Sequence, residues 1–162
     1  TRPDARERAR KGLGELGLKV VCLFPAMHHF RLDSDEALAV FEIANDLGSA
    51  AFVHCGVLSV GVRKKLGLTS PFDIRLGNPL ALRRVAHAFP ELPILVPHFG
   101  AGFFEKALIA ADLHPSIYLD TSSSNSWIKY LPGMTLNTVF RTALDVLGPR
   151  RLDLLVGDRG AR

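Results

Sequence analysis

The sequence has 162 residues, of which 48% are hydrophobic, and its formal net charge is +4. This length suffices for one domain, residues 1–162, with a substantial core. The basic residues are dispersed, and their densest groups are Arg2–Lys11, which acidic residues interrupt, and Arg63–Lys65. A nucleic-acid-binding protein needs a continuous basic face, and a membrane helix needs roughly 18 to 20 consecutive apolar residues. The sequence has neither feature, so we expect no nucleic-acid partner and no membrane span.

The two cysteines, Cys22 and Cys55, both lie in apolar runs typical of strands. Two such residues do not make a disulfide framework, and a free cysteine is commonly buried as a small apolar residue. We therefore expect both thiols to be buried, in a protein of the reducing cytoplasm. The sequence begins at Thr1 and stops at Arg162, close to a predicted strand. Both ends are accordingly interpreted as truncated.

The first half of the sequence predicts helices and strands in alternation. Apolar runs bounded by turn residues indicate buried strands, and apolar residues at helical spacing indicate amphipathic helices. The predicted elements are a polar helix over Pro3–Glu15, a strand over Gly17–Pro25, a helix from the capping-box residues Asp33 and Glu36 to Gly48, and a strand over Ala50–His54.

The second half continues the alternation after a long connection, Gly56–Asn78, of the kind that often forms a lid or binding loop. Strands that alternate with single helices predict βα units and a parallel sheet, because each crossover needs a helix to return the chain. The remaining predicted elements are a helix over Pro79–Phe89, a strand over Pro93–His98, a helix after it, a strand over Ser116–Asp120, a helix ending at Gly148, and a strand over Leu152–Val156. The fold class is therefore α/β with about five parallel strands.

Histidines end two consecutive predicted strands, His54 and His98, and a glycine follows each within two residues. The carboxyl ends of parallel strands meet at one edge, where α/β proteins place their ligands. Neutral imidazole is the commonest protein ligand for zinc-like metals. The pair therefore predicts one functional site, although each ring could instead bond loop backbone. Asp120 ends a strand at the same edge and either orients a neighbour or caps the next turn.

The other histidines give weaker signals. His28 and His29 are adjacent, so at most one of them faces the predicted site, and an exposed loop pair is the favoured interpretation of both. His87 falls in mid-helix and His114 in a connecting loop, so we expect them to be structural or surface residues.

Four motifs stand in the order and spacing of a known family. The sequence resembles the amidohydrolase-related (amidohydrolase 2) family of metal-dependent TIM-barrel enzymes, in the branch that includes aminocarboxymuconate-semialdehyde decarboxylase. The likeness runs from about Gly17 to Gly157. The motifs that carry it are Phe-Val-His-Cys-Gly at 52–56, Pro-His-Phe-Gly-Ala-Gly at 97–102, Leu-Asp-Thr-Ser-Ser-Ser-Asn at 119–125 and Gly-Pro-Arg-Arg-Leu at 148–152.

The resemblance implies that the chain forms strands four to eight of a (β/α)₈ barrel. It also implies that the intact protein binds a divalent metal, with zinc as the first choice. It implies that His54 is a metal ligand, that His98 acts at the reaction centre, and that Asp158 completes the metal site. The family's His-x-His ligand pair on strand one has no counterpart here. Asp158 follows Gly157 directly, where the family has a Ser or Thr between them, and a one-residue slip turns a strand side chain to the other face. Whether Asp158 faces the site stays open.

Two functions are compatible with this resemblance. The first is a metal-dependent hydrolase or non-oxidative decarboxylase that acts on a small carboxylated or cyclic substrate and is incomplete in this chain. Arg63 would then be either a bidentate clamp for a substrate carboxylate or a plain solvated arginine. The second is a catalytically inactive half-barrel that acts through self-association or a partner chain. Because its outer strands would lack neighbours, we expect a homo-oligomer.

Overall fold

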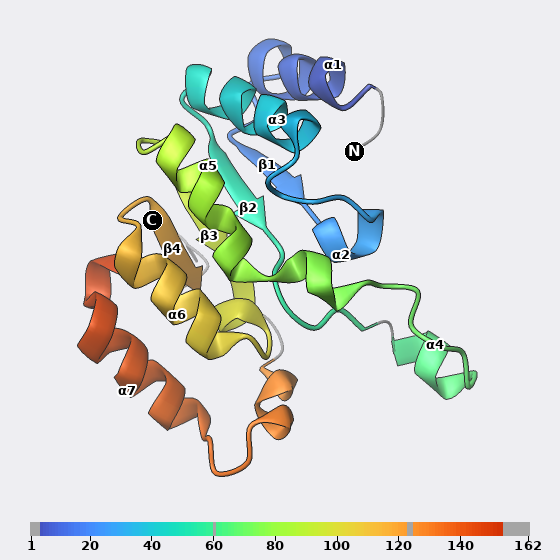
Figure 1. The fold of residues 1–162 in the computed structure, drawn as a ribbon, viewed down its shortest axis with the longest axis vertical. Coiled ribbons are helices and arrows are strands. Elements are labelled where there is room, and N and C mark those ends of the chain that lie inside the picture. The colour runs from blue at the N-terminus through green and yellow to red at the C-terminus, as the bar shows by residue number, and fades with distance from the viewer. Residues whose placement is uncertain (1–3, 60, 123–124, 154–162) are drawn as a thin grey trace, which may run out of the picture.

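A computed structural model describes residues 4–59, 61–122 and 125–153. Strands and helices alternate along this chain, as its sequence predicts (Figure 1). The strands are short, and each lies inside or at the edge of its predicted range. They are β1 (Val20–Leu23), β2 (Ala50–Val53), β3 (Ile94–Val96), β4 (Ile117–Asp120) and β5 (Leu152–Asp153).

The helices connect these strands, and 3₁₀ turns extend several of them. The α-helices are α1 (Ala5–Ala9), α2 (Pro25–His28), α3 (Asp35–Asp46), α4 (Gly61–Lys65), α5 (Leu82–Ala88), α6 (Phe104–Leu113) and α7 (Leu136–Leu147). A π-helical segment, Arg10–Glu15, continues α1, and 3₁₀ turns occupy Ile74–Gly77, Pro79–Ala81, Pro97–Gly100, Ser126–Tyr130 and Pro149–Arg151.

The five strands form one parallel sheet in the order β1-β2-β3-β4-β5. Each strand therefore pairs with the next one along the chain. A doubly wound open sheet reverses its strand order at a switch point, whereas the wall of a (β/α)₈ barrel runs in sequential order. The fold is α/β with five parallel strands and corresponds to part of a (β/α)₈ barrel, which confirms the predicted fold class.

The two faces of the sheet differ in burial. Figure 1 shows α3, α5 and α6 on one side of the sheet, which we call the helix face. Side chains on the opposite face, which we call the open face, stay half-buried or exposed, and in a closed barrel they would line the interior. The helix face carries Ala51, Val53, Ile94, Val96, Ile117 and Leu119, all 0% exposed, whereas the open face carries Val20, Cys22, Phe52, Leu95 and Tyr118.

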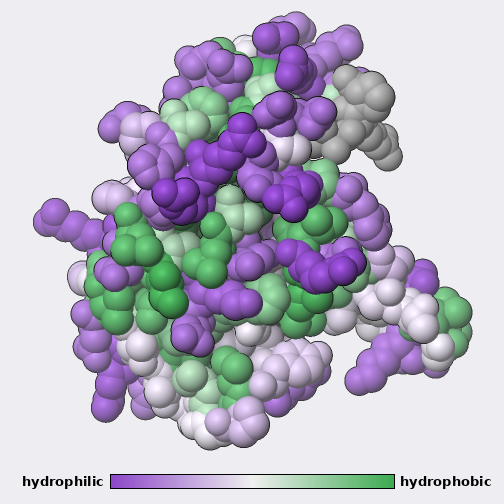
Figure 2. Space-filling view, in the orientation of Figure 1, coloured by the Kyte–Doolittle hydropathy of each residue, from purple (hydrophilic) through white to green (hydrophobic). Residues whose placement is uncertain are grey.

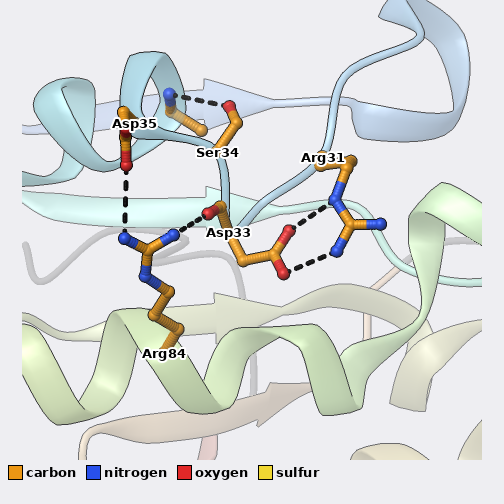
Figure 3. Close-up of polar contacts among 6 residues, drawn as sticks. Arg31, Asp33, Ser34, Asp35 and Arg84 are labelled. Atoms are coloured by element: carbon orange, nitrogen blue, oxygen red, sulfur yellow. Dashed lines mark hydrogen bonds and ion pairs between the residues drawn. The ribbon is translucent and has the colours of Figure 1, made fainter.

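The start of α3 differs from the predicted capping box. Ser34 is the N-cap, and its hydroxyl accepts the N–H of Ala37 at 3.3 Å. Asp33 instead forms a bidentate pair with Arg31, with N···O distances of 3.0 and 2.7 Å. Arg84 of α5 donates to the Asp33 carbonyl and lies 3.2 Å from the Asp35 carboxylate (Figure 3). Arg84 thus ties the start of α3 to α5, and Ser34 replaces Asp33 as the cap of the first turn.

Two other predictions need correction. The strand predicted over Pro93–His98 ends at Val96, because Pro97 lacks an N–H and begins a 3₁₀ turn. Cys22 is exposed on the edge strand β1, whereas Cys55 is buried and burial raises the pKa of its thiol to about 12. In the described residues, no helix is long and apolar enough to cross a membrane.

Candidate functional site

His54 directly follows β2 and lies on the open face. The alternation of side chains along β2 buries Val53 under the helices and turns Phe52 and His54 the other way. The His54 side chain is nevertheless only 5% exposed. Its ring stacks on that of Phe24, with centroids 5.6 Å apart and an interplanar angle of 19°. A half-buried aromatic side chain therefore covers one side of the imidazole.

His98 lies in a strained turn just after β3. His98 and Phe99 both have left-handed backbones, with φ values of 55° and 52°. Left-handed geometry costs a non-glycine residue roughly 1–2 kcal/mol, so other contacts must stabilise the turn. Phe99 supplies them, because its 0% exposed ring packs edge-on against Phe140 at 5.0 Å and Phe104 at 6.0 Å. The buried ring of Phe99 thus holds its neighbour His98 at the edge of the sheet.

The two histidines come together as their positions in the sequence predict. Their ring centroids are 5.6 Å apart with an interplanar angle of 62°. Burial and, after it, the neighbouring His98 ring lower the pKa of His54 from 6.5 to about 4. His54 is consequently neutral at pH 7 and offers a nitrogen lone pair. A neutral imidazole with a second histidine at this separation is chemically suited to hold a divalent ion.

The loops after β2 and β3 are pressed against each other beside this pair. The N–H of Val57 donates to the carbonyl of Ala101 at 2.7 Å. A Cβ added at Gly56 would lie 2.0 Å from the carbonyl oxygen of Gly100 and 2.4 Å from that of Ala101. Only glycine fits such an approach, and its φ of 80° is also a conformation that glycine favours. Gly56, the glycine after His54, therefore allows the two loops to come together.

The residues after β4 reach the same place. The buried carboxylate of Asp120, 1% exposed, accepts the backbone N–H of Ser122. The carbonyl oxygen of Ser122 lies 2.6 Å from Nδ1 of His98, and the Ser122 hydroxyl lies 3.4 Å from the same atom. Of the two roles left open for Asp120, the structure shows the cap of the next turn, and that turn contacts His98.

Arg63 stands apart from the histidine pair. It lies in α4, which projects from the body of the molecule (Figure 1), and its guanidinium donates to the carbonyl of Thr69 at 3.1 and 3.3 Å. Its predicted contact with a substrate carboxylate stays a prediction. Asp158 lies outside the described residues.

The remaining histidines occupy two places. His28 is exposed and contacts the edge of Phe24 at 6.3 Å, whereas His29 is exposed in a left-handed turn. His87 and His114 pair with each other at 6.0 Å, away from the site. Phe24 is not among the residues predicted from the sequence. The signal that could find it is the register, since Leu23 pairs with Val53 and Phe24 therefore neighbours His54.

The site is open and its ligand set is small. Across residues 4–59, 61–122 and 125–153, no three His, Cys, Asp or Glu side chains gather closely enough to hold a metal ion. A groove of about 650 Å³ runs along β1 between α1 and α3, and its lining includes His28 but neither His54 nor His98. The described residues thus bring together two imidazole rings and one aromatic wall.

A sequential parallel sheet with paired histidines at its carboxyl edge is the architecture of an α/β-barrel enzyme. The chain belongs to the amidohydrolase family, whose family model matches residues 1–152. No curated protein was found to match the sequence.

Solved structures share the fold. An uncharacterised TIM-barrel protein, Bb4693 from Bordetella bronchiseptica, has a TM-score of 0.64 and 20% identity over 88% of this chain and 45% of its own. 5-Carboxyvanillate decarboxylase LigW from Sphingomonas paucimobilis has a TM-score of 0.58 and 16% identity over 93% of this chain and 50% of its own. A 5-carboxyvanillate decarboxylase from Novosphingobium aromaticivorans was solved in complex with manganese and a nitrobenzoic acid. It has a TM-score of 0.57 and 14% identity, over 93% of this chain and 49% of its own. The chain spans about half the length of these structures.

Proposed function

We propose that the chain carries part of the active site of a metal-dependent hydrolase or non-oxidative decarboxylase, with His54 as a metal ligand. The observation that carries the proposal is the pair of rings 5.6 Å apart at the ends of neighbouring strands, one of them neutral at pH 7. A buried histidine that stays neutral keeps the lone pair that a metal requires.

The proposed metal is a divalent cation, with zinc as the first choice. One structural neighbour was crystallised with manganese, so manganese is the second. A divalent ion bound here would act as a Lewis acid and make water more acidic. Catalytic zinc sites usually hold three protein ligands. His54, and His98 if it also ligates, leave at least one position to Asp158 or to another polypeptide segment.

His98 is the residue proposed to act on the substrate. It lies beside His54 but is held by a separate turn, so it can exchange a proton with a substrate or stabilise developing charge next to the metal. The rings of Phe24 and Phe52 lie nearby on the open face, with their centroids 6.4 Å apart. Such an apolar wall suits a small cyclic substrate, and two structural neighbours are decarboxylases of an aromatic acid. The Nε and one terminal nitrogen of Arg63 donate to Thr69, so a substrate carboxylate would bind at the other edge of its guanidinium.

An inactive half-barrel is the second candidate. The observation that favours it is the presence of only two clustered donors within the described residues, together with the half-buried open face. Such a chain would act by self-association or by joining a partner chain that supplies the other wall.

Calorimetric titration with Zn²⁺ and Mn²⁺ tests the first proposal. We expect weak binding by the chain and its loss in His54→Ala, because one of two donors is removed. His87→Ala is the matched control, since His87 belongs to a second histidine pair of similar spacing, 6.0 Å. The same samples are then assayed for carbon dioxide release from aromatic carboxylic acids. Binding that survives His54→Ala, or that His87→Ala abolishes, would reject the proposed metal ligand.

A further inference from the structure

The contact between His98 and Ser122 determines which ring nitrogen carries the proton. Nδ1 of His98 lies 2.6 Å from the carbonyl oxygen of Ser122. A carbonyl oxygen only accepts hydrogen bonds, so the donor in this contact is the ring N–H. The neutral ring is therefore the Nδ1–H form, which leaves Nε2 as the nitrogen with a free lone pair. The Ser122 hydroxyl, at 3.4 Å, is a weaker partner for the same atom.

Asp120 fixes the position of the residue that makes this contact. Its carboxylate accepts the N–H of Ser122, whose carbonyl oxygen in turn reaches His98. Asp120 is 1% exposed at the end of β4, and β4 is paired with β3 next to the His98 turn. A buried carboxylate at the end of a rigid strand can hold this turn in one position, whereas a free loop of serines would sample several.

We propose that Asp120 is a positioning residue, which acts through Ser122 to hold His98 as the Nδ1–H tautomer with Nε2 free. The histidine side chain in water favours the opposite tautomer, Nε2–H, so the protein must supply the bias. In the role proposed for this site, an unprotonated Nε2 is the atom that would take a substrate proton or bind the metal. That consequence rests on the proposed function, whereas the tautomer itself does not.

Long-range ¹H–¹⁵N NMR of the metal-free, histidine-labelled chain at pH 7.5 tests the proposal. The His98 signals are identified by their loss in His98→Gln. We expect the wild-type ring to show a protonated Nδ1 and an unprotonated Nε2. Asp120→Ala should shift the ring toward Nε2–H, because Ser122 is no longer held. Asp120→Asn should keep the wild-type tautomer, because its amide oxygen can accept the same N–H.

Two further variants separate positioning from general stability. Ser122→Ala keeps the backbone carbonyl and should keep the Nδ1–H form, and Asp112→Ala on α6 should change nothing. A wild-type Nε2–H ring, or an unchanged ring in Asp120→Ala, would overturn the proposal. If Asp120→Ala does not fold, the similarly sized Asp120→Leu replaces it. Failure of both to fold would make Asp120 a residue that the fold itself requires, and the positioning role would be wrong.

The same samples distinguish this inference from the proposed function. Zn²⁺ is added to the wild-type chain after the tautomer has been measured. An Nδ1–H ring whose signals do not respond to Zn²⁺ would keep the positioning role of Asp120 and count against the metal site. An Nε2–H ring whose signals respond to Zn²⁺ would support the metal site and overturn the positioning role of Asp120.

Discussion

At the scale of single residues, burial determines the chemistry of the site. His54 is 5% exposed and stacks on Phe24, and it lies beside a second imidazole. Burial and, after it, the neighbouring imidazole disfavour a positive charge on the ring. A protonated His54 would repel a cation, whereas the neutral ring is ready to bind one.

The low pKa of His54 makes stability depend on pH. The pKa is about 4 in the folded chain against 6.5 for a free ring, so the unfolded state binds more protons between these values. Stability should therefore fall as the pH drops from about 6.5 to 4, by roughly 2–3 kcal/mol from this residue. Urea unfolding of the wild-type chain and His54→Gln at pH 7.0, 6.0 and 5.0 measures the effect. The variant should lose less stability than the wild type over this range, and equal losses would contradict the assigned pKa.

The residue-scale predictions from the sequence succeed where strand ends determine position. His54 and His98 follow neighbouring strands of a parallel sheet, which is enough to predict that they meet. The left-handed turn at His98 and Phe99 could not be predicted, because non-glycine residues disfavour that conformation and tertiary contacts such as the packing of Phe99 stabilise it. The exposure of Cys22 could not be predicted either, since an apolar run does not reveal which of its side chains lie on the open face.

At the scale of elements, the loops after β2 and β3 form one packed unit. Gly56 fits between the carbonyls of Gly100 and Ala101, and the Val57 N–H bonds to the second of these. This contact joins the turn that holds His54 to the turn that holds His98.

Replacing Gly56 should disrupt that unit. Gly56→Ala places a Cβ 2.0 Å from a backbone oxygen, so we expect a loss of more than about 3 kcal/mol in the free energy of unfolding. Gly133→Ala is the matched control, because Gly133 has the same φ of 80° but no heavy atom within 4 Å of an added Cβ. Its cost should be only about 1–2 kcal/mol, from backbone strain alone. Equal losses in urea unfolding would show that the close approach is not a constraint.

Arg151 joins the end of α6 to β4. Its guanidinium donates to the carbonyls of Ala111, His114 and Ile117 and lies over the ring of Tyr118. Arg151→Met should cost about 2 kcal/mol, because these part-buried carbonyls lose a charged donor. The neighbouring exposed Arg150 is the control, and Arg150→Met should change stability by less than about 0.5 kcal/mol. Urea unfolding of both variants measures the difference, and similar midpoints would refute this role for Arg151.

The order of the elements was predictable, and their boundaries were less so. Alternating strand and helix patterns were enough to predict a parallel α/β sheet. The long connection after Gly56 also contains α4, which is short and has no buried residue, so no apolar stripe marks it in the sequence. The start of α3 is determined by Ser34 rather than Asp33, because Asp33 is engaged by Arg31.

At the scale of the whole molecule, apolar surface remains on both sides of the sheet. The open face holds half-buried Phe52, Leu95 and Tyr118, and the edge strand β1 leaves Val20 39% exposed. Figure 2 shows groups of hydrophobic side chains among polar ones on the side of the helices. Exposed residues on this side include Ile109 and Leu113 of α6 and Leu144 of α7. Such surfaces favour association.

We therefore expect the chain to self-associate through its open face and the β1 edge. Sedimentation velocity at several concentrations should show a rising average mass. Val20→Lys places a charge on the edge strand and should reduce association, because natural edge strands use lysine to prevent pairing. Leu113→Lys, on the outer surface of α6, is the control and should have less effect. A monomer at every concentration, or a larger effect of Leu113→Lys, would contradict this assignment.

The histidine pair as a metal site is the central claim, and anomalous diffraction tests it most directly. Crystals of the chain are soaked in Zn²⁺ or Mn²⁺, and data are collected on both sides of the metal's absorption edge. The account predicts an anomalous peak beside the rings of His54 and His98, which vanishes in His54→Ala. A peak only at the His87–His114 pair, or no peak at His54 under saturating metal, would contradict it.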